Sequence, residues 1–173
     1  YRDFREEAEK NNFNYFLEVF NPQTKTGLNQ LQLGEYVNDC ILKTLAGQLK
    51  SERPLFLKIA YNGPKAMEEL AGYDPKNLIV GILGGGKGTT RDCFELISKS
   101  CKYGAKVALF GRKINLAEDQ QLIVKTMRDV VNGMTSTEGV KFYHDQLKKK
   151  KIKPDRSLDK VLMITEKVLK LSL

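Results

Sequence analysis

A lysine inside an apolar stretch is the residue of this chain best suited to covalent chemistry. Residues 55–61 read LFLKIAY, and strand alternation places Lys58 on the face opposite Leu57 and Ile59. An ammonium group that loses contact with water needs a partner or a lowered pKa. A neutral amine with other cations nearby is what carbonyl addition and Schiff-base formation require. Lys58 is therefore a candidate nucleophile.

Glu18 is the second charge inside a predicted strand. It lies in FLEVF, residues 16–20, where alternation puts Phe16 and Phe20 on the same face. A carboxylate beside a strand lysine forms an ion pair or carries protons for it. Both interpretations stay open, and so does a purely structural Lys58 that is paired with Glu18 or lies at a sheet edge.

A glycine-rich turn follows the third predicted strand, where residues 78–92 read LIVGILGGGKGTTRD. A P-loop needs a serine or threonine after its lysine to hold magnesium, and here Gly88 follows Lys87. The dinucleotide pattern G-x-G-x-x-G fails as well, because Thr89 stands where the third glycine belongs. A nucleotide triphosphate site and a dinucleotide site are both disfavoured.

The other use of such a turn is a phosphate site built from backbone N–H groups. A second basic glycine turn, FGRKIN, follows the next predicted strand at residues 110–115. In a barrel, turns after neighbouring strands make a phosphate site jointly. The alternative is that the glycines only relieve crowding. The candidate donors are Gly85, Gly86 and Gly111, and the candidate cations are Lys87, Arg112 and Lys113.

Four strand-helix units would position these residues. Apolar stretches at 14–20, 55–61, 77–83 and 105–111 predict strands, and periodicity and capping residues predict helices at 34–50, 64–73, 89–104 and 114–133. Strands that alternate with helices in this way form a parallel sheet covered by helices, so the predicted class is α/β. An open doubly wound sheet and a (β/α)8 barrel both fit the pattern.

Both ends of the chain are polar. Residues 2–10 are helix-prone, and the run KKKKIK at 148–153 suits a solvated helix end and linker. Residues 157–173 predict one amphipathic helix that packs against the domain, with a partner interface as the alternative. Its apolar face consists of Leu158, Val161, Leu162, Thr165, Val168 and Leu169. The expected organisation is a domain at 1–147 and a basic linker and helix at 148–173.

The composition fits one globular domain with anionic partners. The chain has 173 residues, 41% of them hydrophobic, and a formal net charge of +8. Phosphorylated metabolites, RNA and anionic membranes all suit that charge. Cys40, Cys93, Cys101 and the single His144 indicate neither a disulfide framework nor a zinc site. No apolar run reaches the roughly 20 residues of a membrane span, so we expect a soluble, cytoplasmic chain whose start lies upstream of Tyr1.

The ordered motifs KIAYNG, GILGGGKG and GAKVALFGRKIN together resemble the C-terminal half of archaeal-type class I aldolases. These barrel enzymes are related to fructose-bisphosphate and deoxyribose-phosphate aldolases, and the resemblance covers about residues 14–130. It implies that Lys58 is the Schiff-base lysine of the sixth strand, with Tyr61 and Gly63 matching its surroundings. It also implies phosphate-binding turns after the seventh and eighth strands, which here are Gly84, Gly85, Gly111 and Arg112.

Three features depart from the family pattern. Phe20 stands where the family often has a tyrosine for proton transfer. The first four strands, with their acidic catalytic residue, are absent from this chain. The GGGKGTT turn has more glycines and is more basic than the family pattern. The tail from residue 148 onward has no counterpart in the family.

The resemblance implies the C-terminal half of a (β/α)8 barrel, units five to eight. The protein would act without a cofactor as a class I aldolase on a phosphorylated sugar or carbonyl compound, with Lys58 as the iminium lysine and Glu18 or Tyr61 assisting proton transfer. Half a barrel exposes two sheet edges, so a missing N-terminal half or a second copy would complete it. The phosphate would bind at Gly84, Gly85, Gly86, Lys87, Gly111 and Arg112.

Two alternatives to the aldolase interpretation remain. The first is a non-catalytic or differently catalytic barrel protein that binds phosphate while Lys58 is structural. The second is a basic module that binds RNA or another anion, with the lysine run at 148–153 as its footprint. The second lacks the exposed aromatic residues between basic ones that stacking on single strands uses.

Overall fold

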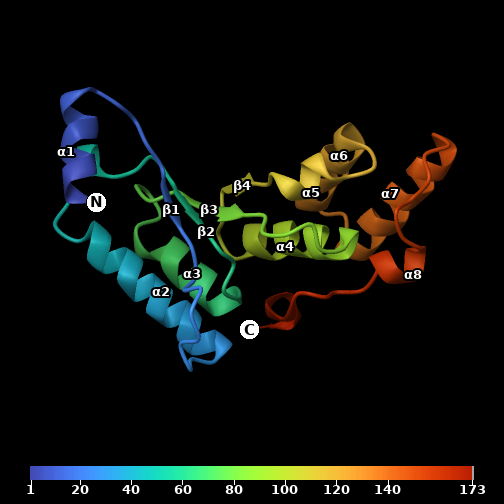
Figure 1. The fold of residues 1–173 in the computed structure, drawn as a ribbon, viewed down its shortest axis with the longest axis horizontal. Helices are drawn as coiled ribbons and strands as arrows, with labels where there is room; N and C mark the ends of the chain where they lie inside the picture. The colour runs from blue at the N-terminus through green and yellow to red at the C-terminus, as the bar shows by residue number, and fades with distance from the viewer. Residues whose placement is uncertain (173) are drawn as a thin grey trace.

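Four parallel strands form the centre of the protein (Figure 1). The structure, a computed structural model, describes residues 1–172. The strands pair in sequence order, and each neighbouring pair is parallel. They are β1 (Leu17–Val19), β2 (Leu57–Ile59), β3 (Val80–Leu83) and β4 (Val107–Leu109). The predicted α/β class with a parallel sheet is confirmed, although each strand is shorter than the apolar stretch that predicted it.

One row of aligned residues crosses the sheet and defines its two faces. Glu18 is in register with Lys58, Lys58 with Gly81, and Gly81 with Val107. Residues aligned across parallel strands point to the same side, so these four share one face. The alternate positions form the other face, and those of the two central strands are at most 3% exposed: Leu57, Ile59, Val80 and Ile82.

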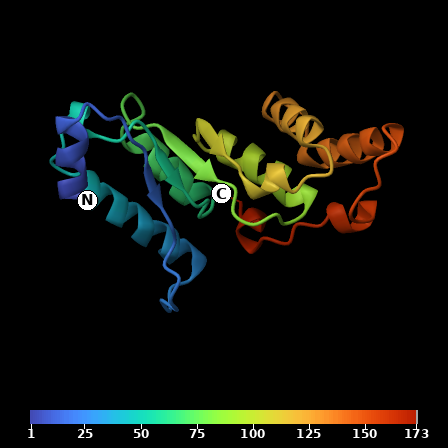
Figure 2. The same cartoon turned by 45° about the horizontal axis from the view of Figure 1, so that its top comes forward.

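Three helices cover the buried face of the sheet, namely α2 (Gln30–Leu45), α3 (Pro64–Tyr73) and α4 (Thr90–Lys102). Figures 1 and 2 show them on the same side of the strands. Their apolar sides meet the sheet in one core, in which Leu70 and Phe94 have no exposed surface. Burying a side chain of this size contributes about 1.5–3 kcal/mol relative to leaving it exposed. The core therefore holds the strands at their inner face.

The opposite face of the sheet carries no helix within residues 1–172 and is called the open face below (Figure 1). Aromatic rings lie along it. Phe16 and Phe56 stack with their ring centroids 5.0 Å apart, and Phe16 and Phe20 are 46% and 62% exposed. An apolar surface of this kind is one that proteins usually cover with a partner or a ligand.

A second group of helices packs on α4 beyond β4. It consists of α5 (Arg112–Asn115), α6 (Gln120–Val131) and α7 (Ser136–Lys149). Phe94 and Tyr143 meet edge to face with centroids 6.4 Å apart. Gly139 allows close packing, because a Cβ there would lie 2.9 Å from Val130 Cγ2. α4 is thus the element that both layers share.

Hydrogen bonds between residues close in sequence set where the helices begin and end. α1 (Arg2–Lys10) forms as predicted, as do α3 and the helix that starts after Thr89. α2 starts earlier than predicted, because Asn29 and Gln32 make a capping box, and it ends before Gly47, whose φ is +75°. The single helix predicted at 114–133 is wrong: Asp119 caps a new helix at that point by accepting from the Leu122 N–H, so α5 and α6 are separate.

The tail is not the single amphipathic helix that the sequence predicted. It contains two short turns, α8 (Leu158–Val161) and the 3-10 turn η2 (Lys167–Lys170). Between them the Thr165 N–H donates to Asp92 of α4 and not to a carbonyl one turn earlier, which interrupts helical pairing. Packing against the domain is confirmed, since Val161 and Leu169 are buried. α7 continues to Lys149, so the basic run at 148–153 begins within a helix.

The sheet is open at both edges. In the described part of the chain, β1 pairs only with β2 and β4 only with β3, which leaves unpaired backbone groups on their outer sides. Half barrels and other open parallel sheets share this strand order, so the half-barrel stays a prediction. No helix among residues 1–172 has the length and apolar character needed to cross a lipid bilayer.

Candidate functional site on the open face

Lys58 and Glu18 form an ion pair in the middle of the open face. The Lys58 Nζ lies 2.9 Å from Glu18 Oε1, and the two side chains are 23% and 29% exposed. The pair results directly from the parallel register that aligns the two residues. The same ammonium lies 5.8 Å from the centroid of the Phe16 ring. The predicted contact between Glu18 and Lys58 is present, and both side chains keep some contact with solvent.

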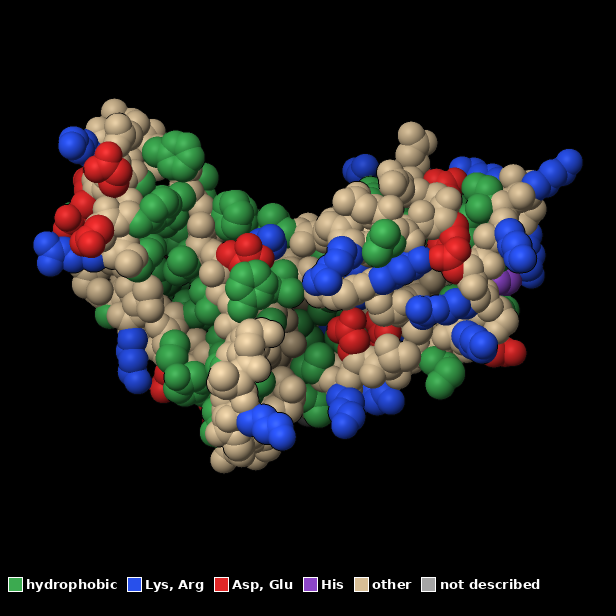
Figure 3. Space-filling model, viewed as in Figure 1, with side chains coloured by type: hydrophobic (Ala, Val, Ile, Leu, Met, Phe, Trp, Pro, Cys, Tyr) green, Lys and Arg blue, Asp and Glu red, His purple; other side chains and the backbone are tan. Residues whose placement is uncertain are grey.

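The surroundings of this pair are apolar. The stacked rings of Phe16 and Phe56 lie on the same face as the pair, and Figure 3 shows further hydrophobic side chains along a hollow between two raised sides of the molecule. Gly81, the neighbour of Lys58 on β3, lets the chains approach closely, because a Cβ there would lie 2.8 Å from the Leu57 carbonyl oxygen and 3.0 Å from Leu109 Cδ1. Glycine is therefore required at the position beside the lysine.

Tyr61 lies on the helix-facing side and not beside Lys58. It is 5% exposed and belongs to the core between the sheet and the helices. Burial raises the pKa of its hydroxyl, and the charges of Tyr103 and Glu95 raise it further. Within residues 1–172 this hydroxyl has no hydrogen-bond partner. Its position does not support the expected role in proton transfer at Lys58.

An amide pair that the sequence did not predict lies at the carboxyl edge of the sheet. The Asn21 side chain donates to Asn62 Oδ1 at 2.8 Å, and the Asn62 side chain donates back to Asn21 Oδ1 at 2.9 Å. These residues follow β1 and β2, so the two bonds join the loops directly beyond Glu18 and Lys58. Asn62 is 7% exposed, and its place in KIAYNG was the only signal that pointed to it.

The two glycine turns lie against each other, as the sequence analysis expected. A Cβ on Gly84 would lie 2.9 Å from the Phe110 ring, so the turn after β3 touches the turn after β4. Gly85 has a φ of +64°, and no atom approaches the Cβ position of Gly85 or Gly86 within 4 Å. In the described chain the N–H groups of Gly85 and Gly86 have no protein acceptor, which leaves them open to an anion.

The three predicted cations have different surroundings. Lys87 Nζ lies 2.5 Å from Asp155 Oδ2. The Lys113 side chain is fully buried, and its Nζ lies 3.1 Å from Glu166 Oε1. Arg112 is exposed at the start of α5, beside Gly111. The glycine turns and Arg112 are therefore accessible to a phosphate, whereas the two lysines already contact carboxylates of the tail.

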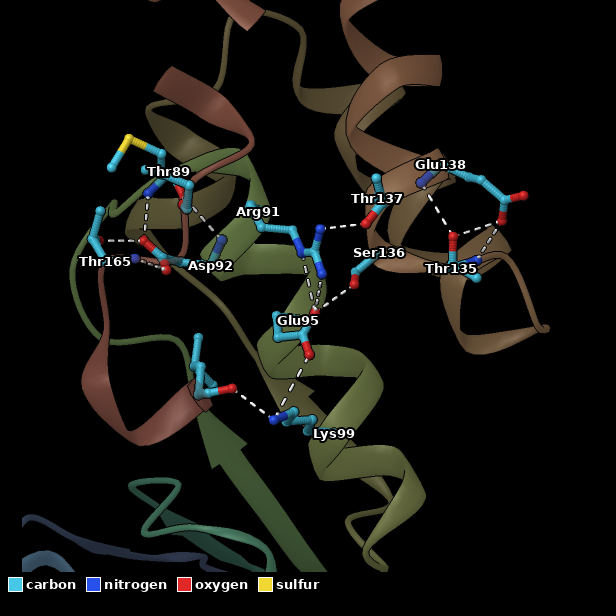
Figure 4. Close-up of polar contacts among 12 residues, drawn as sticks. Thr89, Arg91, Asp92, Glu95, Lys99, Thr135, Ser136, Thr137, Glu138 and Thr165 are labelled. Atoms are coloured by element: carbon cyan, nitrogen blue, oxygen red, sulfur yellow. Dashed lines mark hydrogen bonds and ion pairs between the residues drawn. The ribbon is translucent and has the colours of Figure 1, made fainter. Parts of the chain in front are cut away.

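The start of α4 carries its own carboxylate. Asp92 is fully buried and accepts hydrogen bonds from the Thr89 N–H at 2.9 Å and from the Thr165 hydroxyl at 2.5 Å (Figure 4). Burial alone would raise the pKa of Asp92, but the bonds from Thr165, Thr89 and Glu166 hold it below its ordinary value. The capping box at the start of α4 thus gives the Thr89 and Asp92 N–H groups their acceptors.

Further polar contacts along α4 join helices and are structural. Arg91 and Glu95 form an ion pair at 3.1 Å, Arg91 also bonds Thr137, and the Ser136 hydroxyl donates to Glu95 (Figure 4). They tie α4 to the start of α7. In the described residues no group of three or more His, Cys, Asp and Glu side chains could hold a metal ion.

No protein-family model and no curated protein matches this chain. The resemblance to class I aldolases therefore rests on the motifs around Lys58 and the two glycine turns alone.

Proposed function

We propose that this protein forms a Schiff base through Lys58 with a phosphorylated carbonyl compound and makes or breaks a carbon–carbon bond, as a class I aldolase does. The observation that carries the proposal is the position of Lys58 at the centre of an accessible apolar face, with a carboxylate 2.9 Å from its amine. An amine in apolar surroundings beside a proton acceptor is what iminium chemistry needs.

The chemistry requires one proton acceptor, and Glu18 occupies that position. The Lys58 ammonium gives a proton to Glu18, and the nitrogen lone pair adds to the substrate carbonyl carbon. A proton then passes from this nitrogen to the alkoxide oxygen, which gives a hydroxyl group. Glu18 returns the proton to the resulting hydroxyl, which leaves as water and gives the iminium. Glu18 then takes the proton of the substrate β-hydroxyl while the Cα–Cβ electrons move toward the iminium, which releases an aldehyde and leaves an enamine.

The phosphate of the substrate would bind at the neighbouring glycine turns. Support comes from the open N–H groups of Gly85 and Gly86 and from the exposed guanidinium of Arg112. Gly84 lets the turn after β3 contact Phe110 of the other turn, and a Cβ on Gly111 would meet no atom within 4 Å. Lys87 joins this site once its contact with Asp155 opens.

The open face needs further protein for its completion. Two free sheet edges and exposed phenylalanines favour additional strands, from an upstream segment or from a second copy of this chain. Barrel closure by such strands would place the Lys58 ion pair inside. The thiols of Cys40, Cys93 and Cys101 are free, which suits a cytoplasmic setting.

A phosphate-binding protein without Lys58 chemistry is the second candidate. It is favoured by the position of Tyr61, which leaves Glu18 as the one proton-transfer group beside Lys58 among the described residues. The RNA-binding alternative has less support, because Lys150 of the basic run lies 2.6 Å from Asp119 Oδ2 and is thereby partly neutralised.

Borohydride trapping tests the proposal. The protein is incubated with three-carbon phosphorylated aldehydes and ketones, reduced with borohydride, and mapped by peptide mass spectrometry. We expect a reduced adduct on Lys58 that is lost in Lys58→Arg, which keeps the ion pair with Glu18. Lys65→Arg is the matched control, because Lys65 is also paired with a glutamate but lies exposed on α3. Adducts spread over surface lysines, with none enriched at Lys58, would refute the proposal.

A further inference from the structure

The C-terminal residues 154–172 lie across the turn after β3 and the start of α4, and are called the strap here. The Arg156 guanidinium donates to the Gly88 carbonyl at 3.1 Å, and the Thr89 hydroxyl donates to the Met163 carbonyl at 2.7 Å. Figure 4 shows Thr165 reaching Asp92 from the opposite segment. The strap therefore meets the loop that carries the candidate phosphate donors.

One end of the strap is anchored firmly. Asp92 accepts from the Thr165 N–H at 2.8 Å and from its hydroxyl, with the Glu166 N–H at 3.3 Å. Leu169 is fully buried, and Lys99 Nζ donates to its carbonyl at 2.6 Å. Glu166 also neutralises Lys113, whose side chain has no contact with solvent. Removing a partner from a buried charge is costly, so this end stays in place.

The other end of the strap is held loosely. Its side-chain contacts are the ion pair of Asp155 with Lys87, whose side chains are 55% and 36% exposed, and the bond from the exposed Arg156 to the Gly88 carbonyl. The Asp155 N–H also donates to Glu118 at 3.1 Å. Ion pairs open to solvent are weak and exchange with dissolved ions. The ion pair of Asp155 with Lys87 can thus exchange with a dissolved anion while the anchor at Asp92 stays in place.

We propose that Asp155 is an internal competitor that occupies Lys87 until a phosphoryl group displaces it. The proposal rests on the phosphate site of the proposed function. A phosphoryl dianion would gain the Lys87 ammonium together with the open N–H groups of Gly85 and Gly86, whereas the Asp155 carboxylate reaches the ammonium alone. Asp155 thereby sets a threshold: dianionic phosphoryl ligands bind, and carboxylates in the same concentration range do not.

Calorimetric titration with inorganic phosphate, and separately with acetate, tests this inference. We expect Asp155→Asn to bind phosphate about two- to fivefold more tightly than the wild type, in line with the weakness of exposed ion pairs. The same variant should gain measurable acetate binding. Asp159→Asn is the matched control, because it removes the same charge from an exposed residue of the strap. It should leave both affinities unchanged.

A double-variant cycle places the effect at Lys87. In a Lys87→Met background, Asp155→Asn should give no further gain in phosphate affinity. Equal phosphate affinity in the wild type and Asp155→Asn would overturn the competition and leave the phosphate site standing. No phosphate binding in any variant would overturn both. Borohydride trapping of a non-phosphorylated ketone on Lys58 reports separately on the Schiff-base chemistry.

Discussion

The amine of Lys58 and the carboxylate of Glu18 lie on adjacent strands, so the backbone pairing of β1 and β2 sets the distance between them. Such a pair is more rigid than one between two loop side chains, because both Cα atoms are fixed by the sheet. The bonds between Asn21 and Asn62 extend this control to the loops directly beyond the strands. The pairing of the strands thus sets the positions of the reactive side chains on the open face.

Replacing Glu18 by Gln should slow iminium formation without preventing phosphate binding. The amide cannot accept the ammonium proton of Lys58, and loss of a general base costs roughly 10²–10⁴-fold in rate. The measurement is the initial rate of borohydride-trapped adduct on Lys58. Glu35→Gln, which opens the comparable surface pair with Lys65, is the control and should react at the wild-type rate. A wild-type rate in Glu18→Gln would assign the proton transfer to another group.

Alternation along β2 predicted Lys58 on the open face, and the structure places it there beside Glu18. The same alternation places Tyr61 with Leu57 and Ile59 on the buried side, which is where its side chain lies. The motif around Lys58 suggested that Tyr61 assists proton transfer, because a motif matches the spacing of residues but does not show to which face of the sheet each side chain points. Continuing the alternation of side chains from Ile59 to Tyr61 is sufficient to place Tyr61 on the buried face.

α4 is the element on which the sheet layer, the second helical group and the strap converge. Its position in the sequence was predictable from its threonine N-cap and its apolar periodicity. The contacts of Asp92 with Thr165 were not, since they join residues 73 positions apart and have no local sequence signal. The strap was predicted as a helix because its apolar residues have helical spacing. The bond from its Thr165 N–H to Asp92 of α4 replaces a helical bond and could not be predicted from that spacing.

Replacing Asp92 by Asn should destabilise the protein at neutral pH and reduce its sensitivity to acid. The pKa of Asp92 is below its ordinary value of 3.8 in the folded state. Its ionised form therefore stabilises the fold above that ordinary value, and this contribution disappears as the pH falls through the lowered pKa. We expect a loss of about 1–3 kcal/mol in the free energy of unfolding at neutral pH.

Urea unfolding of both proteins between about pH 6 and pH 2 measures this effect. The wild type should lose the contribution of Asp92 at the acid end of that range, whereas Asp92→Asn should not. Asp39→Asn, an exposed substitution on α2, is the control. Parallel stability curves for the wild type and Asp92→Asn would mean that the acid-sensitive carboxyl is a different one.

At the scale of the whole molecule, one side is a finished core and the other is an apolar sheet face with two open edges. The α/β class could be predicted, because four apolar stretches alternate with helical ones. The half-barrel that the resemblance implies stays a prediction, since closure depends on strands outside those four. The basic side chains behind the net charge of +8 and the exposed phenylalanines lie in different regions. The basic side chains in Figure 3 gather toward the α6 and α7 end of the molecule.

Self-association of this chain through its open face is expected in solution. Light scattering after gel filtration should give a mass above 19.6 kDa that rises with concentration. Phe20→Glu should shift the mass toward 19.6 kDa, because a charge at this 62% exposed position opposes burial of the face. Val124→Glu on α6, also at an exposed apolar position, should not. A monomeric wild type at every concentration would favour an upstream segment as the cover.

The hydrogen bonds between Asp92 and Thr165 also have a consequence during synthesis of the protein. A ribosome makes the chain from its N-terminus, so α4 is complete long before residue 165 emerges. Until then Asp92 lacks three of its hydrogen-bond donors, and Lys113 lacks its carboxylate partner. The last layer of the domain therefore closes late in translation, and a pause before residue 165 would prolong the exposure of these groups to chaperones and proteases.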